Sequence, residues 1–229
     1  MTGTAKDTTG KSVGLDLSDR ESTYVVLDDE GKVKETGKVE TSAPALGKLF
    51  GGMSTRVVAL EVGTHSPWVS RLLYRLGHHV VVANPRQLQL ITRSQKKTDR
   101  NDAEKLARLA RVDEYLLAPV THRSEAAQVD LAVIQARAQL VEVRTKLILH
   151  VRGKVKACGA RLPGCSAAAF AHKMAELIPE ELQGALLEIV DEIGQLSVRI
   201  GRYDRRITRL AQESYPESKL LQQVPGWGR

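Results

Sequence analysis

Four carboxylates in the first half of the chain have the residue types and spacing needed to hold divalent metal ions. Asp16 lies in the middle of an apolar segment, and Glu61 ends another. Asp99 and Asp102 are three residues apart, so on a helix both lie on one side. An ionised side chain within a strand is costly unless something compensates for it. A role for these acids beyond packing is therefore expected.

Together the four acids suit phosphodiester chemistry with paired metal ions. Mg²⁺ (or Mn²⁺) takes hard oxygen ligands and keeps several waters, so three or four carboxylates suffice. Two such ions held about 3.5–4 Å apart polarise a phosphate and activate the attacking group. Each acid alone has an ordinary explanation: solvent exposure for Asp16, and helix capping or dipole placement for Asp99 and Asp102. The combination of the four predicts a metal-dependent nuclease site.

Basic residues accompany these acids. No Asp or Glu occurs between Glu61 and Asp99, and a second acid-free stretch runs from Val143 to Ala175. The formal net charge of +7 favours polyanionic partners, although a solvated helix face is the alternative for the second stretch. We predict nucleic-acid contacts for Arg71, Arg86, Arg93, Lys96, Lys97, Arg100, Arg144, Lys146, Arg152, Lys154 and Lys156.

Strand and helix signals in the first half predict a mixed sheet that positions the acids. The expected elements are strands at 12–17, 23–27, 32–39 and 56–61, a helix at 68–76, a strand at 79–83 and a helix at 99–112. Three meandering strands followed by strand, helix, strand and helix is the order of an α/β RNase H-like fold. That fold places the strand of Glu61 beside the strand of Asp16, so the two acids meet at one face.

Beyond Ala118-Pro119 the strand signals end and the pattern becomes helical. One helix is expected over 124–155, and two apolar stripes along it imply packing on two sides. The first stripe consists of Val133, Leu140, Val143 and Leu147, and the second of Ile134, Val141, Ile148 and Val155. After a break at Pro163-Gly164, a second long helix begins near Pro179. Its apolar seam alternates steps of four and three, as a coiled coil does, along Leu182, Leu186, Ile189, Ile193, Leu196, Ile200, Tyr203, Ile207 and Leu210. The seam packs either on the preceding helix or on another subunit, with another subunit favoured.

These features resemble the DEDD transposases of the IS-110 and IS-1111 insertion sequences. The residues that carry the resemblance are Gly14-Leu15-Asp16-Leu17-Ser18, Leu60-Glu61-Val62-Gly63-Thr64-His65, Leu76-Gly77 with Val82-Ala83-Asn84-Pro85, and Lys97-Thr98-Asp99-Arg100-Asn101-Asp102-Ala103. The last segment is the most specific. The long helical region that follows is also similar to the coiled coil of the family.

The resemblance implies a RuvC-like domain in which Asp16, Glu61, Asp99 and Asp102 bind Mg²⁺ (or Mn²⁺). It also implies a homo-oligomer, a dimer or tetramer formed through the coiled coil, that cuts and rejoins DNA during transposition under the guidance of a structured bridge RNA. The expected layout is a flexible N-terminus at 1–11, the RuvC-like domain at 12–118, the helical coiled-coil region at 119–215 and the start of a further domain at 216–229.

The C-terminus departs from the family pattern. Full-length members continue from a Pro-Gly-x-Gly motif into a domain that supplies a nucleophilic serine, and Pro225-Gly226-Trp227-Gly228 is followed only by Arg229. Ser214 and Ser218 lie too early to match that serine. The expectation is a fragment or truncated gene product that carries no nucleophile of its own.

Other functions receive less support. An actin-like ATPase or sugar kinase needs glycine two residues after its first-strand Asp, where this chain has Ser18. A Holliday-junction resolvase and a non-catalytic coiled-coil scaffold for nucleic acid remain alternatives. The N-terminus lacks the hydrophobic region of a secretory signal and no apolar run could span a membrane, which predicts a cytoplasmic protein. The family resemblance implies a bacterial protein associated with the nucleoid. Cys158 and Cys165 are expected to be reduced structural thiols.

Overall fold

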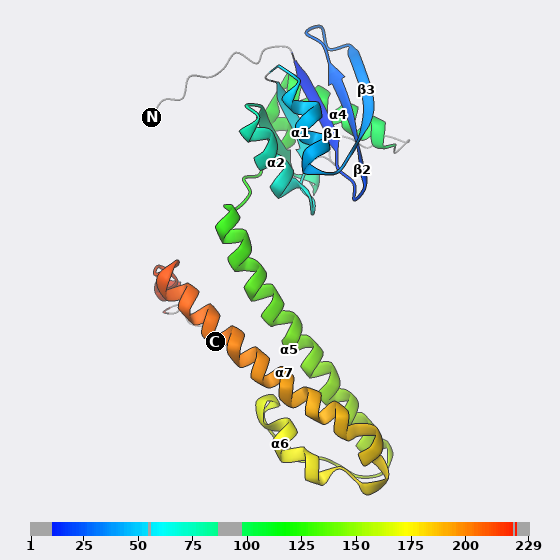
Figure 1. Ribbon diagram of the computed structural model, residues 1–229, viewed down its shortest axis with the longest axis vertical. Helices are drawn as coiled ribbons and strands as arrows, with labels where there is room; N and C mark the ends of the chain where they lie inside the picture. Colours follow the sequence, from blue (N-terminus) through cyan, green and yellow to red (C-terminus); the bar gives the residue numbers. More distant parts are fainter. Residues whose placement is uncertain (1–10, 55, 87–97, 222, 224–229) are drawn as a thin grey trace. The chain divides into compact units, whose positions relative to one another are not determined.

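The computed structural model describes residues 11–54, 56–86, 98–221 and 223, and it divides into a sheet unit up to Arg123 and a helical unit from Ser124. Figure 1 shows both units. Apart from Lys11, the N-terminal segment expected to be flexible falls outside the described residues, as do residues 222 and 224–229 of the expected C-terminal domain start.

The sheet unit contains a mixed sheet of five strands in the order β3-β2-β1-β4-β5. Strands β1 and β3 both pair antiparallel with β2, whereas β4 is parallel to β1 and β5 is parallel to β4. This is the RNase H-like arrangement that the sequence predicts. The strands are β1 (Ser12–Asp16), β2 (Glu21–Leu27), β3 (Val33–Glu40), β4 (Val57–Glu61) and β5 (His79–Ala83).

Helices cover both faces of this sheet. Helices α1 (Ala43–Gly51) and α2 (Ser66–Arg75) pack on the face that presents Val13 and Leu15. Helix α4 (Asp99–Val112) packs on the opposite face, as Figure 1 shows. Because side chains alternate along a strand, the parity of a residue decides which helices it meets.

Helix α1 is a correction, because the sequence prediction places no helix or strand between 39 and 56. The hydroxyl of Ser42 accepts a hydrogen bond from the Ala45 amide at 3.4 Å and caps the helix. Pro44 lies in the first turn, where its missing N–H is not needed. Leu46 and Phe50 are fully buried. A capping serine followed by proline was the signal available in the sequence.

The segment after α4 belongs to the sheet unit. The 3₁₀ turn η1 (Glu114–Leu117) follows the helix, and the Asn84 amide donates to the Leu117 carbonyl at 3.0 Å. The Val120 amide then donates to the Val82 carbonyl at 2.8 Å. These bonds attach the segment to the edge of β5, so the unit ends a few residues beyond the predicted boundary at Ala118-Pro119.

The helical unit is a hairpin of two long helices, α5 (Glu125–Ala157) and α7 (Glu180–Glu213), in agreement with the predicted helical region. Tyr215 donates to Asp130 Oδ2 at 3.0 Å, where the end of α7 meets the start of α5. The short elements of this unit are η2 (Ala167–Ala169), α6 (Phe170–Met174), η3 (Ala175–Leu177) and α8 (Ser218–Leu221).

Much of the regular seam of α7 is buried within the chain itself. Leu186, Ile193, Leu196 and Ile200 are at most 3% exposed. Ile193 shares a core with Val155 of α5 and with residues of α6. Packing on the preceding helix therefore accounts for these seam positions, in place of the favoured pairing with another subunit.

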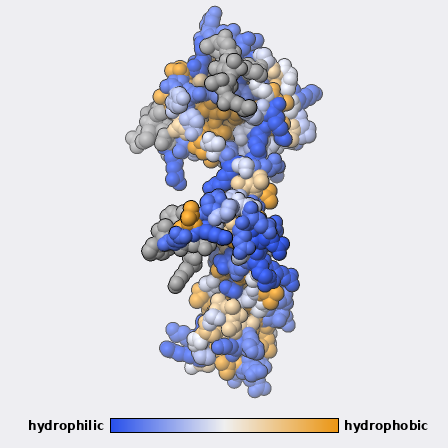
Figure 2. All heavy atoms as spheres, turned by 90° about the vertical axis from the view of Figure 1, so that its left-hand side faces the viewer, coloured by the Kyte–Doolittle hydropathy of each residue, from blue (hydrophilic) through white to orange (hydrophobic). Residues whose placement is uncertain are grey.

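The second apolar stripe predicted for α5 is only partly covered. Val155 is buried, whereas Ile134 is 48% exposed and Val143, from the first stripe, is 44% exposed. Figure 2 shows apolar colouring between polar residues toward the lower end of the helical unit. Across the described residues, none of the helices combines the length and the apolar character needed to cross a membrane.

Candidate metal centre

Asp16 and Glu61 end adjacent parallel strands. The register of β1 on β4 pairs Leu15 with Leu60, and the two acids are the next residue on each strand. Both side chains are half-buried. Strand alternation places them on the face of the sheet that α4 covers, because Gly14 of β1 contacts α4 and lies two residues before Asp16. The prediction that these two strands are neighbours in the sheet is confirmed.

Helix α4 lies directly on the backbone of β1. A Cβ atom added to Gly14 would lie 1.7 Å from the Ala103 carbonyl oxygen and 2.7 Å from the Ala107 amide nitrogen. Only glycine permits this approach. The small residues on both sides therefore bring the helix, and the acids of its first turn, close to the strand that carries Asp16.

The direction of α4 is set by contacts near its other end. Arg108 Nη1 donates to the Gly31 carbonyl at 3.1 Å, in the turn between β2 and β3. That turn lies at the opposite end of β1 from Asp16, because β2 runs antiparallel to β1. The first turn of α4, with Asp99 and Asp102, is consequently at the Asp16 end. All four predicted acids thus lie at the end of the sheet where β1 and β4 finish, on the side that α4 covers. This end of the sheet is called the acidic edge below.

Capping does not account for the two helix acids. Thr98 is the N-cap residue, and its hydroxyl accepts a hydrogen bond from the Asn101 amide at 3.2 Å. Asp99 is exposed and Asp102 is half-buried. Both still gain from the positive end of the helix dipole, but the capping bond is made by another residue.

Two lysines that the sequence analysis did not single out lie beside the acids. Lys105 Nζ is 3.1 Å from Asp102 Oδ1. Lys38 Nζ is 2.9 Å from Glu21, whose hydrogen bond and charge raise the pKa of Lys38, and the charge of Asp99 raises it further. The spacing of Lys105 from Asp102 was readable as a helical i, i+3 pair. The position of Lys38 depends on the register of β3, which the sequence does not reveal.

The acids suit a divalent metal in their chemistry. Carboxylate oxygens are the ligands that Mg²⁺ and Mn²⁺ prefer, and the ends of β1, β4 and the first turn of α4 present them on one face. Among the residues that the structure describes, no three or more His, Cys, Asp or Glu side chains lie close enough together to hold a metal ion. Lys105 occupies a cation position next to Asp102.

The basic residues predicted in the sheet unit are not all at this edge. Arg86 is exposed just after β5, whose carboxyl end lies beside that of β4, and Arg100 is exposed in the first turn of α4. Arg71 lies on α2, which covers the other face, and its charge adds to burial in lowering the pKa of His122. The remaining predicted contacts of this unit lie outside the described residues: Arg93, Lys96 and Lys97.

Two of the arginines predicted in the helical unit have internal partners. Arg152 donates to the carbonyls of Leu162 at 3.0 Å and Pro163 at 2.8 Å, and its guanidinium lies 5.2 Å from the Phe170 ring centre. Arg144 donates to the Ser197 hydroxyl at 3.2 Å, and burial lowers its pKa. Both side chains therefore have packing roles.

The predicted lysines of this unit are exposed. Lys146 Nζ is 2.6 Å from Glu142, whose pKa it lowers. Lys154 and Lys156 lie near the end of α5, where cations complement the helix dipole. These lysines are better placed than Arg144 and Arg152 for contact with nucleic acid.

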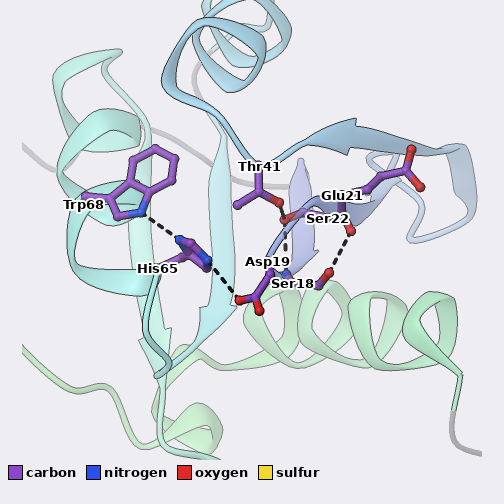
Figure 3. Close-up of polar contacts among 7 residues, drawn as sticks. All are labelled: Ser18, Asp19, Glu21, Ser22, Thr41, His65 and Trp68. Carbon is purple, nitrogen blue, oxygen red and sulfur yellow. Dashed lines mark hydrogen bonds and ion pairs between the residues drawn. The ribbon is translucent and has the colours of Figure 1, made fainter.

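A series of polar side-chain contacts lies next to the acidic edge, and the sequence analysis did not predict it. Trp68 Nε1 donates to His65 Nδ1 at 3.1 Å, and His65 Nε2 lies 3.3 Å from Asp19 Oδ1. Figure 3 shows the series running from α2 to the turn after β1. The nearness of Trp68 to His65 at helical spacing was readable, whereas the contact with Asp19 depends on the pairing of β1 with β4.

The strand order, with helices on both faces of the sheet, is that of an RNase H-like domain. A family model of DEDD transposases of the IS-110 type, described as a transposase, matches residues 13–158, more than half of the chain. The chain therefore belongs to this transposase family. The solved structure of RuvC from Thermus thermophilus is similar at 15% identity and a TM-score of 0.34, over 44% of this chain and 96% of that one. No curated protein matches.

Proposed function

We propose that this chain acts in transposition as a metal-dependent enzyme that takes part in the cleavage and exchange of DNA strands, with Asp16, Glu61, Asp99 and Asp102 as ligands of Mg²⁺ (or Mn²⁺). The observation that carries the proposal is the common location of the four acids. Two end neighbouring strands on the face that α4 covers, and the helix brings the other two to the same edge. Family membership supports DNA as the substrate.

The proposed roles of the acids and of the basic residues follow from their positions. Asp16 and Glu61, fixed on rigid strands, hold the carboxylate oxygens at a constant spacing. Asp99 and Asp102 approach from the helix, and Lys105 withdraws from Asp102 when a cation replaces its ammonium group. Arg86 and Arg100 attract phosphate toward the edge. A bound divalent ion would polarise the scissile phosphate and activate the attacking group.

The helical unit is proposed to bind nucleic acid and a second copy of the chain. Lys154 and Lys156 would track a phosphate backbone, either DNA or a structured guide RNA, as the family resemblance suggests. The exposed apolar side chains of Ile134, Val143 and Val198 support contact with another subunit in a dimer or tetramer. We place this activity in the bacterial cytoplasm, at the nucleoid.

Replacing Asp16 by Asn tests the metal assignment, because the amide keeps the size of the side chain and removes its charge. Mg²⁺ and Mn²⁺ binding to the chain is measured by titration calorimetry. The wild type should bind, and the Asp16→Asn variant should lose at least tenfold in affinity. Asp29→Asn, in the exposed turn between β2 and β3, is the matched control and should bind as the wild type does.

The same variants separate the proposal from its alternatives. If Asp16→Asn binds metal as well as the wild type does, the acids are structural and the chain is a non-catalytic scaffold. A metal-dependent cleavage of four-way junctions, with no activity on transposon-end DNA, would instead favour a Holliday-junction resolvase. Both DNA substrates are assayed with this chain in the presence and absence of Mg²⁺.

A further inference from the structure

The loops that leave β1 and β4 are joined by a side-chain bridge. Asp19 lies in the turn after β1, three residues beyond Asp16, and His65 ends the loop after β4, four residues beyond Glu61. His65 Nε2 lies 3.3 Å from Asp19 Oδ1. The bridge therefore connects the segments that follow two of the proposed metal ligands (Figure 3).

The indole of Trp68 determines how His65 can act in this bridge. An indole N–H is a donor only, so His65 Nδ1 must accept its hydrogen bond, which is 3.1 Å long. The neutral imidazole then carries its proton on Nε2 and donates it to the Asp19 carboxylate. The two rings also meet edge to face, with centres 6.0 Å apart. Trp68 thus orients His65 toward Asp19.

The turn after β1 is internally stiff. Ser18 donates from its amide to the Ser22 hydroxyl at 3.4 Å and from its own hydroxyl to the Glu21 carbonyl at 3.1 Å. The Ser22 hydroxyl is in turn 2.7 Å from the Thr41 hydroxyl. These bonds, drawn in Figure 3, hold the turn against the start of β2 and the end of β3.

The loop after β4 is equally constrained. The Gly63 amide donates to the Ser66 hydroxyl at 2.9 Å, and that hydroxyl donates back to the Gly63 carbonyl at 2.8 Å. Ser66 is fully buried, and the Val62 amide donates to the Ala83 carbonyl of β5 at 3.0 Å. Because each loop is constrained by its own hydrogen bonds, a contact between them can fix the position of one loop relative to the other.

We propose that His65 is a positioning residue, which ties the loop after β4 to the turn after β1 through Asp19 and so restricts the movement of Asp16 and Glu61 relative to each other. The proposal rests on the proposed metal function of these acids. Groups behind metal ligands commonly set metal affinity in this way by fixing ligand orientation. The Asp19 side chain is 95% exposed, so the bridge adds little to overall stability.

Two substitutions of His65 separate donation to Asp19 from acceptance from Trp68. His65→Gln places an amide nitrogen near the Nε2 position and keeps a donor for Asp19, whereas His65→Asn keeps only an acceptor for Trp68. Asp19→Ala removes the other partner, and Asp29→Ala is the matched control in another exposed turn. Mg²⁺ affinity of the chain, by calorimetry, should fall about tenfold in Asp19→Ala and His65→Asn and stay near wild type in His65→Gln and Asp29→Ala.

Amide hydrogen exchange without metal gives a second readout that does not depend on the proposed function. Exchange over 17–20 and 62–66 should accelerate in Asp19→Ala and His65→Asn only, at an unchanged melting temperature. Unchanged exchange, or faster exchange with wild-type Mg²⁺ affinity, would overturn the positioning role. If Asp16→Asn binds Mg²⁺ as the wild type does, the proposed metal function fails instead, and the exchange data still show whether the bridge exists.

Discussion

The sheet unit and the helical unit use their charged residues in opposite ways. In the sheet unit the proposed acids lie where two strands end and a helix begins, and none of them is fully buried. In the helical unit Arg152 lies within the packing, where it bonds two loop carbonyls and covers Phe170. A basic residue in a sequence therefore says little about nucleic-acid binding until its partners are known, whereas an acid at a strand end is more informative.

The two units also differ in how their elements approach one another. Helix α4 meets β1 backbone to backbone through Gly14 and Ala103, a contact that tolerates no added atom. Helices α5 and α7 are held apart by aliphatic side chains such as Val155 and Ile193, which can adjust to modest changes of volume. Substitution should therefore be more damaging at the small-residue contact than in the aliphatic seam.

The largest effect is expected for Gly14→Ala. The new Cβ would lie 1.7 Å from the Ala103 carbonyl oxygen, so α4 must move and carry Asp99 and Asp102 with it. We expect unfolding in urea to show a loss of about 3 kcal/mol, the upper end of overpacking costs. Gly47→Ala is the matched control, because nothing lies within 4 Å of its Cβ in α1. Alanine there should stabilise by about 0.5–1 kcal/mol. Equal stability of Gly14→Ala and wild type would refute the close approach.

Local patterns in the sequence were enough to predict the layers and the elements that carry the four acids. The predicted bounds of β5 and α4 agree with the structure, because alternation and helical spacing are written in consecutive residues. What was missed depends on contacts between distant segments. The bridge from Asp19 to His65 follows from strand pairing, and the internal roles of Arg144 and Arg152 follow from helix packing. These long-range contacts produce no periodic pattern in the sequence from which they could be predicted.

Arg152 and Lys154 offer a sharper test of the contrast in charge use. Arg152→Lys keeps the charge but loses the planar fork that reaches the carbonyls of Leu162 and Pro163, so the free energy of unfolding should fall by about 1–2 kcal/mol. Duplex DNA affinity should not change. Lys154→Ala should leave stability within about 0.5 kcal/mol and reduce the salt dependence of DNA binding by about one unit of slope.

These two variants are measured by urea unfolding and by DNA titration at several salt concentrations. A loss of DNA affinity in Arg152→Lys at unchanged stability would mean that the guanidinium faces nucleic acid and not its own loop. No effect of Lys154→Ala on the salt slope would remove this lysine from the proposed DNA surface. Either result would weaken the contrast between the two units.

The smallest effect concerns Tyr24 on the sheet face opposite α4. Its hydroxyl donates to Glu35 at 2.7 Å, and this bond, with burial and the charge of Glu35, raises the pKa of Tyr24 to about 12. An unfolded tyrosine ionises near pH 10, so the unfolded chain loses this proton first as the pH rises. The stabilisation is complete below about pH 10 and disappears as the pH passes through 12.

Tyr24→Phe removes both the hydrogen bond and this titration. At pH 8 the variant should be less stable than wild type by about 1 kcal/mol, the usual net contribution of one hydrogen bond. The difference should shrink between pH 10 and pH 12, because only the wild type has Tyr24 to ionise. Tyr215, whose pKa Asp130 raises, is present in both proteins and cancels in the comparison. If the difference in unfolding free energy between wild type and Tyr24→Phe stays constant from pH 10 to pH 12, the Glu35 contact does not raise the pKa of Tyr24.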